Sequence, residues 1–64
     1  MTTKQVKATE LQMVTDRAGD VLADGAFVLK VSIQASNVYV RVLVPGGHFR
    51  TRRYRHDQMV KVQD

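Results

Sequence analysis

The segment from Val38 to Val44 limits most strongly what this chain can fold into. Val38, Val40, Val42 and Val44 fall on one face, with Tyr39, Arg41 and Leu43 on the other. A period of two is typical of a strand with one buried side, and valine is enriched in strands. The turn sequence Pro45-Gly46-Gly47 follows at once, because proline presets one dihedral and glycine adopts positive φ. The chain must therefore reverse direction after this strand.

A second strand is predicted before it, over Phe27–Gln34. Phe27, Leu29, Val31 and Ile33 fall on one face of this segment, and Lys30, Ser32 and Gln34 on the other. We expect the apolar set to face the core. The short polar break Ala35-Ser36-Asn37 then makes the two strands a hairpin.

Two strands are predicted after the glycine turn. His48–Arg55 has the length of a strand but no continuously apolar side, which indicates an edge or strongly exposed strand. A brief turn over His56–Gln58 precedes a short closing strand, Met59–Val62, whose two valines face the same way.

The first third of the chain allows two interpretations. Lys4–Ala8 can be a short strand, and Thr9-Glu10-Leu11-Gln12 fits a capping box that would begin a helix over residues 9–18. The alternative is extended chain and loop as far as Gly19-Asp20, then a strand start at Val21-Leu22 and a turn at Asp24-Gly25. We expect one short helix or helical turn near residues 9–18, and we expect residues 1–4 to be disordered.

These elements predict one small domain over residues 1–64, of the mainly β class. We expect an antiparallel barrel or curled sheet of four to five strands. The 64-residue chain has no cysteine, so its stability must come from packing or from self-association, and we expect a homodimer or higher homo-oligomer. No run of about 18 apolar residues is present, and the N-terminus lacks the apolar core of a secretory signal. We therefore expect no membrane contact and a cytoplasmic location.

The positive charge is concentrated in the second half. Residues 1–30 carry four basic and four acidic side chains, whereas residues 31–64 carry six basic and two acidic ones, which accounts for the whole net charge of +4. Such asymmetry favours an acidic partner, with nucleic acid the first candidate. The plainer interpretation is a solvated surface that keeps a small protein soluble.

The run from His48 to His56 carries four arginines and two aromatics in nine positions, with no acid. Arginine forks match phosphate oxygens, and aromatic rings can stack on unpaired bases. On a strand, Arg50, Arg52 and Tyr54 project from one face, whereas Arg53 and Arg55 project from the other. The candidate binding residues for nucleic acid or a protein partner are Arg41, Arg50, Arg52, Arg53, Tyr54, Arg55 and Lys61.

Non-catalytic binding of DNA or RNA through this arginine-rich strand is the function that the sequence favours. The alternative is a protein–protein interaction module, such as a phage or regulatory protein that binds an acidic surface of a host protein, because arginine and tyrosine are also enriched at interface hot spots. Arginines that only solvate a sheet edge and protect it from aggregation are the third interpretation.

Catalysis and cofactor binding have no support in the sequence. No serine–histidine–acid or cysteine–histidine set is recognisable, and so short a chain leaves little room for a pocket. His48 and His56, eight residues apart on one strand, are too distant to share a metal ion. We expect no enzymatic activity, no metal site and no cofactor.

The order of the predicted strands resembles small SH3-like or KOW-like β-barrels. The resemblance covers roughly residues 19–62 and consists of three consecutive strands, the brief turn and the short last strand. The step Gly19-Asp20-Val21-Leu22 before these strands is similar to the glycine–aspartate turn that opens many such barrels. In size and style the chain also resembles the short accessory proteins of bacteriophages. This resemblance implies a barrel that binds nucleic acid or short peptides.

Overall fold

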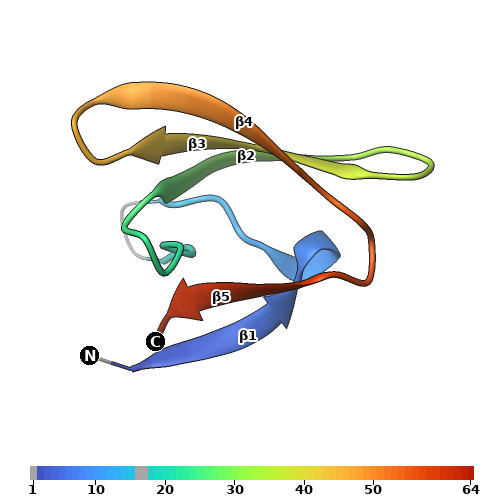
Figure 1. The fold of residues 1–64 in the computed structure, drawn as a ribbon, viewed down its shortest axis with the longest axis horizontal. Coiled ribbons are helices and arrows are strands. Elements are labelled where there is room, and N and C mark those ends of the chain that lie inside the picture. The colour runs from blue at the N-terminus through green and yellow to red at the C-terminus, as the bar shows by residue number, and fades with distance from the viewer. Residues whose placement is uncertain (1, 16–17) are drawn as a thin grey trace.

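The computed structural model describes residues 2–15 and 18–64, which contain five antiparallel strands in two sheets (Figure 1). The strands are β1 (Thr3–Lys7), β2 (Phe27–Ile33), β3 (Val38–Val44), β4 (His48–Tyr54) and β5 (Met59–Gln63). β2, β3 and β4 form a three-stranded sheet in that order, and β1 pairs with β5. The predicted mainly β domain is therefore confirmed, and in its described part the two sheets do not close into a barrel.

The glycine turn sets the register of the β3–β4 hairpin. Gly46 and Gly47 have φ values of 100° and 86°, a region that favours glycine, and the Gly47 N–H donates to the Val44 carbonyl over 3.1 Å. Val44 then lies opposite His48, and the pairing continues without interruption to Val38 opposite Tyr54. Alternate side chains of β4, beginning with His48, therefore lie on the same side of the sheet as the β3 valines.

A β-bulge changes the phase of β2. Val28 lies opposite Val42 and Lys30 opposite Arg41, so Leu29 is an extra residue between two paired ones. Phe27 therefore faces away from the core and is 44% exposed, whereas Val28 is fully buried. The prediction that Phe27 faces inward is wrong, because the bulge interrupts the alternation that the prediction assumed.

The core consists of small aliphatic side chains between the two sheets. Five valines are the largest fully buried side chains, and β2, β3 and β5 supply them. Among the described residues, the buried set is Ala8, Leu11, Leu22, Ala26, Val28, Val38, Val40, Val42, Val60 and Val62. Val6, Val31, Val44 and Tyr54 pack against this set from its margin. No aromatic ring is fully buried among the described residues, so the domain depends on close packing of valines.

Of the short helix or helical turn expected near residues 9–18, the structure shows a single 3-10 turn. A 3-10 helix spans Ala8–Glu10, while residues 11–15 and 18 are not helical and residues 16 and 17 lie outside the described part. The backbone N–H of Val14 donates to the Val28 carbonyl over 2.7 Å. Gln12 and Asp20 are joined twice, through the Gln12 N–H to Asp20 Oδ2 and the Asp20 N–H to the Gln12 carbonyl. These partners outside the segment replace the intrahelical bonds that its weak helix formers would have made.

The alternative interpretation of this segment is confirmed around residues 19–25. Gly19 has a φ of 132°, and a Cβ there would lie 2.3 Å from the Val14 Cα, so only glycine allows the two arms of the loop to pass this closely. Val21 and Leu22 then form single bridges to Phe27 and Val62, one in each sheet, before a turn over residues 23–25. This segment therefore connects the two sheets, because it forms one backbone bridge to each of them (Figure 1).

The N-terminal strand is more ordered than its sequence predicts. Thr3 and Lys4 lie opposite Gln63 and Val62 in the β1–β5 pair, so the expected disorder of residues 1–4 is wrong for these two, and Met1 lies outside the described residues. Pairing with β5 supplies the backbone partners that a free terminus would lack. None of the helical structure within residues 2–15 and 18–64 has the length and apolar character needed to cross a membrane.

Candidate nucleic-acid interface

The three-stranded sheet has one side that faces away from the core, which we call the outer face. The register of its strands arranges nine side chains there in three rows that cross β2, β3 and β4. These rows are Phe27–Leu43–Phe49, Lys30–Arg41–Thr51 and Ser32–Tyr39–Arg53. An apolar row thus lies beside the glycine turn, with two mixed polar rows beyond it.

The outer face is open to solvent and carries only positive charge. Three aromatic side chains are exposed on it, with Phe27 at 44%, Tyr39 at 37% and Phe49 at 55%. Its cations, Lys30, Arg41 and Arg53, are also exposed. None of the nine side chains is a carboxylate. This combination of π-faces and uncompensated cations suits a ligand with flat rings and negative charge.

Arg41 and Phe49 form the closest aromatic–cation contact on this face. The Arg41 guanidinium carbon lies over the Phe49 ring, 5.2 Å from its centroid. This cation–π geometry positions the arginine while leaving its donors available to an incoming anion. The pair therefore presents a ring and a guanidinium together, with Arg41 on the central strand and Phe49 on β4 beside the glycine turn.

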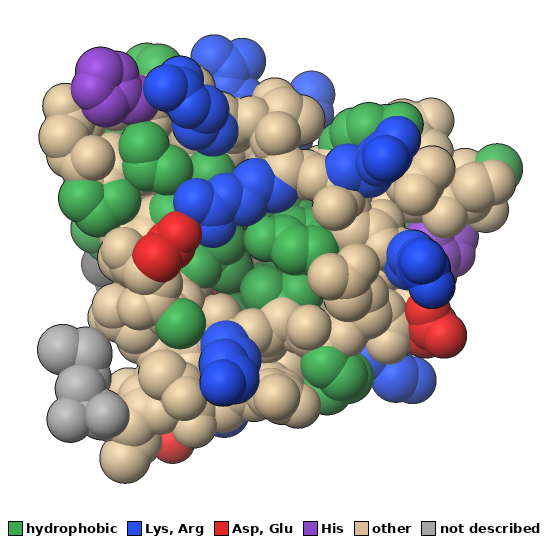
Figure 2. Space-filling view, in the orientation of Figure 1, with side chains coloured by type: hydrophobic (Ala, Val, Ile, Leu, Met, Phe, Trp, Pro, Cys, Tyr) green, Lys and Arg blue, Asp and Glu red, His purple; other side chains and the backbone are tan. Residues whose placement is uncertain are grey.

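The other side of β4 carries the remaining arginines of the strand. Arg50, Arg52 and Tyr54 lie opposite Val42, Val40 and Val38, on the side of the sheet that faces the core. This register confirms the predicted division between two faces for Arg50, Arg52 and Arg53, whereas Arg55 lies beyond the end of β4. Figure 2 shows basic side chains along the edge where β4 lies, with few acidic ones among them and hydrophobic side chains below.

Four aromatic and basic residues of the outer face were not among the predicted site residues: Phe27, Lys30, Tyr39 and Phe49. Phe27 lies on the same side as Lys30 and Arg41 only because the bulge at Leu29 changes the phase of β2. The positions of Arg41 and Tyr39 opposite Thr51 and Arg53 could have been predicted from the sequence, because a three-residue turn places Val44 opposite His48. A comparison of the chain with family models, curated proteins and solved structures found no match. The function must therefore be inferred from the outer face itself.

Arg52 already has an acidic partner. Its Nη2 donates to Asp24 Oδ2 over 2.7 Å, with the two side chains 32% and 52% exposed. This hydrogen bond to Arg52 lowers the pKa of Asp24 below its ordinary value, despite partial desolvation, and raises the pKa of Arg52. The pair joins the 23–25 turn to β4, so Arg52 has a structural role and is less available to a ligand than Arg41 or Arg53.

We expect Arg52→Gln to lower the free energy of unfolding by less than about 1 kcal/mol at pH 7, since exposed ion pairs contribute little. Asp24 has a depressed pKa in the folded state, so its contribution is present above its unfolded pKa and is lost as the pH falls through the folded pKa. The difference in unfolding free energy between the two proteins should therefore shrink as the pH falls below the ordinary pKa of Asp24, as urea unfolding at neutral and at acidic pH can measure. Arg53→Gln is the matched control, and an equal pH-dependent difference there would contradict the assignment.

The other predicted residues lie outside the outer face. Arg50 is exposed and donates to the Phe49 carbonyl over 3.1 Å. Arg55 follows the end of β4, and Lys61 is exposed on β5 opposite Gln5. Of the seven candidates, only Arg41 and Arg53 therefore lie together on the outer face.

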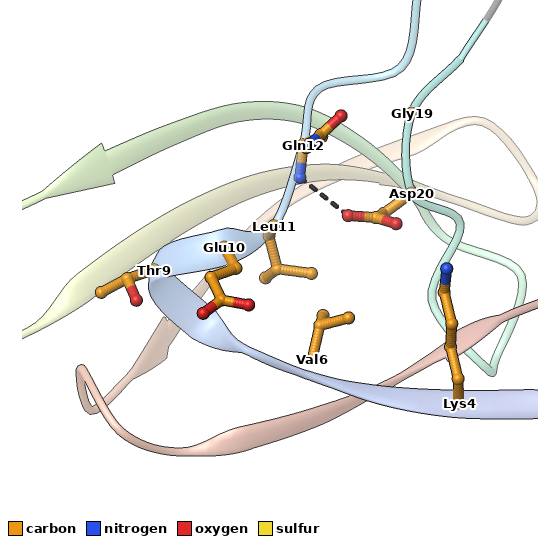
Figure 3. A pocket seen from close by; sticks show the side chains of 8 residues that line it. All are labelled: Lys4, Val6, Thr9, Glu10, Leu11, Gln12, Gly19 and Asp20. Carbon is orange, nitrogen blue, oxygen red and sulfur yellow. Dashed lines mark hydrogen bonds between the residues drawn. The ribbon is translucent and has the colours of Figure 1, made fainter.

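A separate hollow of about 670 Å³ lies between β1, the 3-10 helix and the loop at Gly19 (Figure 3). Its lining residues are Lys4, Val6, Thr9, Glu10, Leu11, Gln12, Gly19 and Asp20. Asp20 accepts the Gln12 N–H over 2.8 Å, so one carboxylate oxygen is already occupied. The charges in this hollow are mixed, and no cluster of three or more potential metal ligands is found in the described part of the chain. The outer face is therefore the stronger candidate.

Proposed function

We propose that this protein is a non-catalytic nucleic-acid-binding domain whose binding surface is the outer face of the β2–β3–β4 sheet. The observation that carries the proposal is the gathering of three exposed aromatic and three exposed cationic side chains on one face without a carboxylate. Phosphate oxygens match arginine donors, and base rings match aromatic faces. A neutral or basic ligand surface would leave these three cations uncompensated.

The alternative is an interaction module for an acidic protein surface. It is favoured by β4, which lies at the end of the strand order and leaves one edge without a partner strand in the described part. A partner strand could add to this edge, and arginines on both its faces could contact acidic side chains. Binding to an acidic protein with no binding to nucleic acid would select this function.

We also retain the SH3-like barrel module and the homo-oligomer as proposals. The strand pairing is compatible with the former, since β1 pairs with β5 and the three middle strands form a meander. A homodimer would place two outer faces in one particle and raise the affinity for a long strand through effective concentration.

The proposal is tested by fluorescence anisotropy with a labelled 12-nucleotide strand over a series of salt concentrations. With three cations at the interface, we expect log affinity to fall linearly with log salt with a slope of about −2. Between 50 and 200 mM salt, this slope corresponds to a loss of about 16-fold in affinity. Absence of binding to any DNA or RNA at the lowest salt would contradict the proposal.

A further inference from the structure

Resting on the proposed function, we propose that the outer face binds single-stranded nucleic acid. Unpaired bases stack on Phe49 and Tyr39, while Arg41 and Arg53 hold the phosphates between them. The sugar is not distinguished, so single-stranded DNA and RNA bind alike. The ligand class is therefore single-stranded nucleic acid, with two of the four side chains contacting bases and two contacting phosphates.

The positions of the two rings require unstacked bases. Phe49 lies in the row of Leu43, and Tyr39 lies four residues from Leu43 along β3, which corresponds to about 13 Å along the strand. Successive stacked bases of one strand are separated by only about 3.4 Å. Both rings can therefore be used together only by a strand whose bases are splayed apart, and a duplex cannot present such bases.

The arrangement of charge supports the same ligand. Arg41 lies between the two aromatic positions, in the middle row, and Arg53 lies beside Tyr39 in the last row. The Arg41 guanidinium already lies over one face of the Phe49 ring, so a base that stacks on the opposite face of this ring would bring its own phosphate within reach of this arginine. Each stacking position is thus adjacent to a phosphate donor.

The indifference to the sugar follows from the donors and acceptors of the face. A 2′-hydroxyl is recognised by groups that accept or donate hydrogen bonds at a fixed position. The outer face has no carboxylate. Of its three hydroxyls, that of Ser32 already accepts a hydrogen bond from the Gln34 amide over 2.9 Å, which leaves those of Thr51 and Tyr39. Its strongest polar groups are the cations, which contact phosphate in either sugar type.

The test compares a 12-nucleotide oligo-dT, a 12-nucleotide oligo-rU and a 12-base-pair duplex in the same anisotropy assay. We expect the two single strands to agree within about threefold and the duplex to bind at least about tenfold more weakly. Tyr39→Leu combined with Phe49→Leu should lower single-strand affinity by at least about 30-fold while changing duplex affinity by less than about twofold. Tyr54→Leu, on the opposite face of the sheet, is the matched control and should leave all three affinities unchanged.

The control variant also supplies a direct signature of stacking. The chain has two tyrosines and no tryptophan, so Tyr39 is the remaining tyrosine in Tyr54→Leu. We expect its emission to be quenched by oligo-dT and not by the duplex. Equal binding of duplex and single strands, insensitive to the aromatic replacements, would overturn this inference and leave the proposed function standing. Failure of all three probes to bind at low salt would overturn both.

Discussion

Arg41→Glu combined with Arg53→Glu should lower the affinity for a 12-nucleotide single strand by at least about 100-fold. Hydrogen bonds to charged groups contribute about 1.5–3 kcal/mol each, so two such contacts correspond to at least this factor. Both side chains are exposed on the outer face, where neither has an acidic partner among the described residues. The thermal midpoint should therefore shift by only a few degrees, as circular dichroism can verify.

The matched control for this variant carries the same charge change elsewhere. Arg50→Glu combined with Arg55→Glu also reduces the net charge from +4 to 0, since each replacement changes it by −2. Arg50 lies on the side of β4 that faces the core, and Arg55 follows the strand. We expect this control to lose less than about tenfold in affinity. Equal losses in the two variants would mean that the total charge, and not the outer face, determines binding.

The largest loss of stability is expected for Val40→Ala. Val40 is fully buried at the centre of β3, with Val31 and Arg52 as its cross-strand neighbours. Removing two methyl groups and leaving a cavity should cost about 2–3 kcal/mol. A domain of this length has a total stability of about 3–10 kcal/mol, so the change removes a large fraction of it. Thermal and urea unfolding should both report this loss.

Ile33→Ala is the control for the packing argument. This replacement removes more carbon atoms than Val40→Ala, but Ile33 is 57% exposed at the end of β2. We expect it to cost less than about 1 kcal/mol, because little apolar surface returns to water. A cost equal to that of Val40→Ala would contradict the burial described for this strand end, and would indicate that a second copy of the chain covers it.

The sequence predicted the strand boundaries best where the alternation of apolar residues and a neighbouring turn motif indicated the same boundary. β3 begins and ends at the predicted residues, because four alternating valines and the glycine turn both act locally. β4 and β5 were predicted to within one residue at each end. The division of Arg50, Arg52 and Arg53 between two faces followed from the alternation alone, and the register confirms it.

Tertiary contacts decided the parts that the sequence did not predict. The bulge at Leu29 depends on the pairing of β2 with β3, and no residue within β2 predicts it from the sequence. The segment after Glu10 satisfies its backbone donors through Val28 and Asp20, so a local capping motif could not decide its conformation. The outer face was therefore only partly anticipated, with Arg41 and Arg53 named among the site residues and Phe27, Lys30, Tyr39 and Phe49 absent.

The central claim is that Arg41 and Arg53 hold phosphates on the outer face, and the salt dependence of binding tests it most directly. The slope of log affinity against log salt should be measured for the unaltered protein, for Arg41→Gln with Arg53→Gln, and for Arg50→Gln with Arg55→Gln. Each lost phosphate contact on a single strand reduces the slope by about 0.7. We expect the outer-face variant to lose about 1.4 from its slope and the other variant to lose nothing. Equal reductions in both variants, or an unchanged slope in the outer-face variant, would contradict the claim.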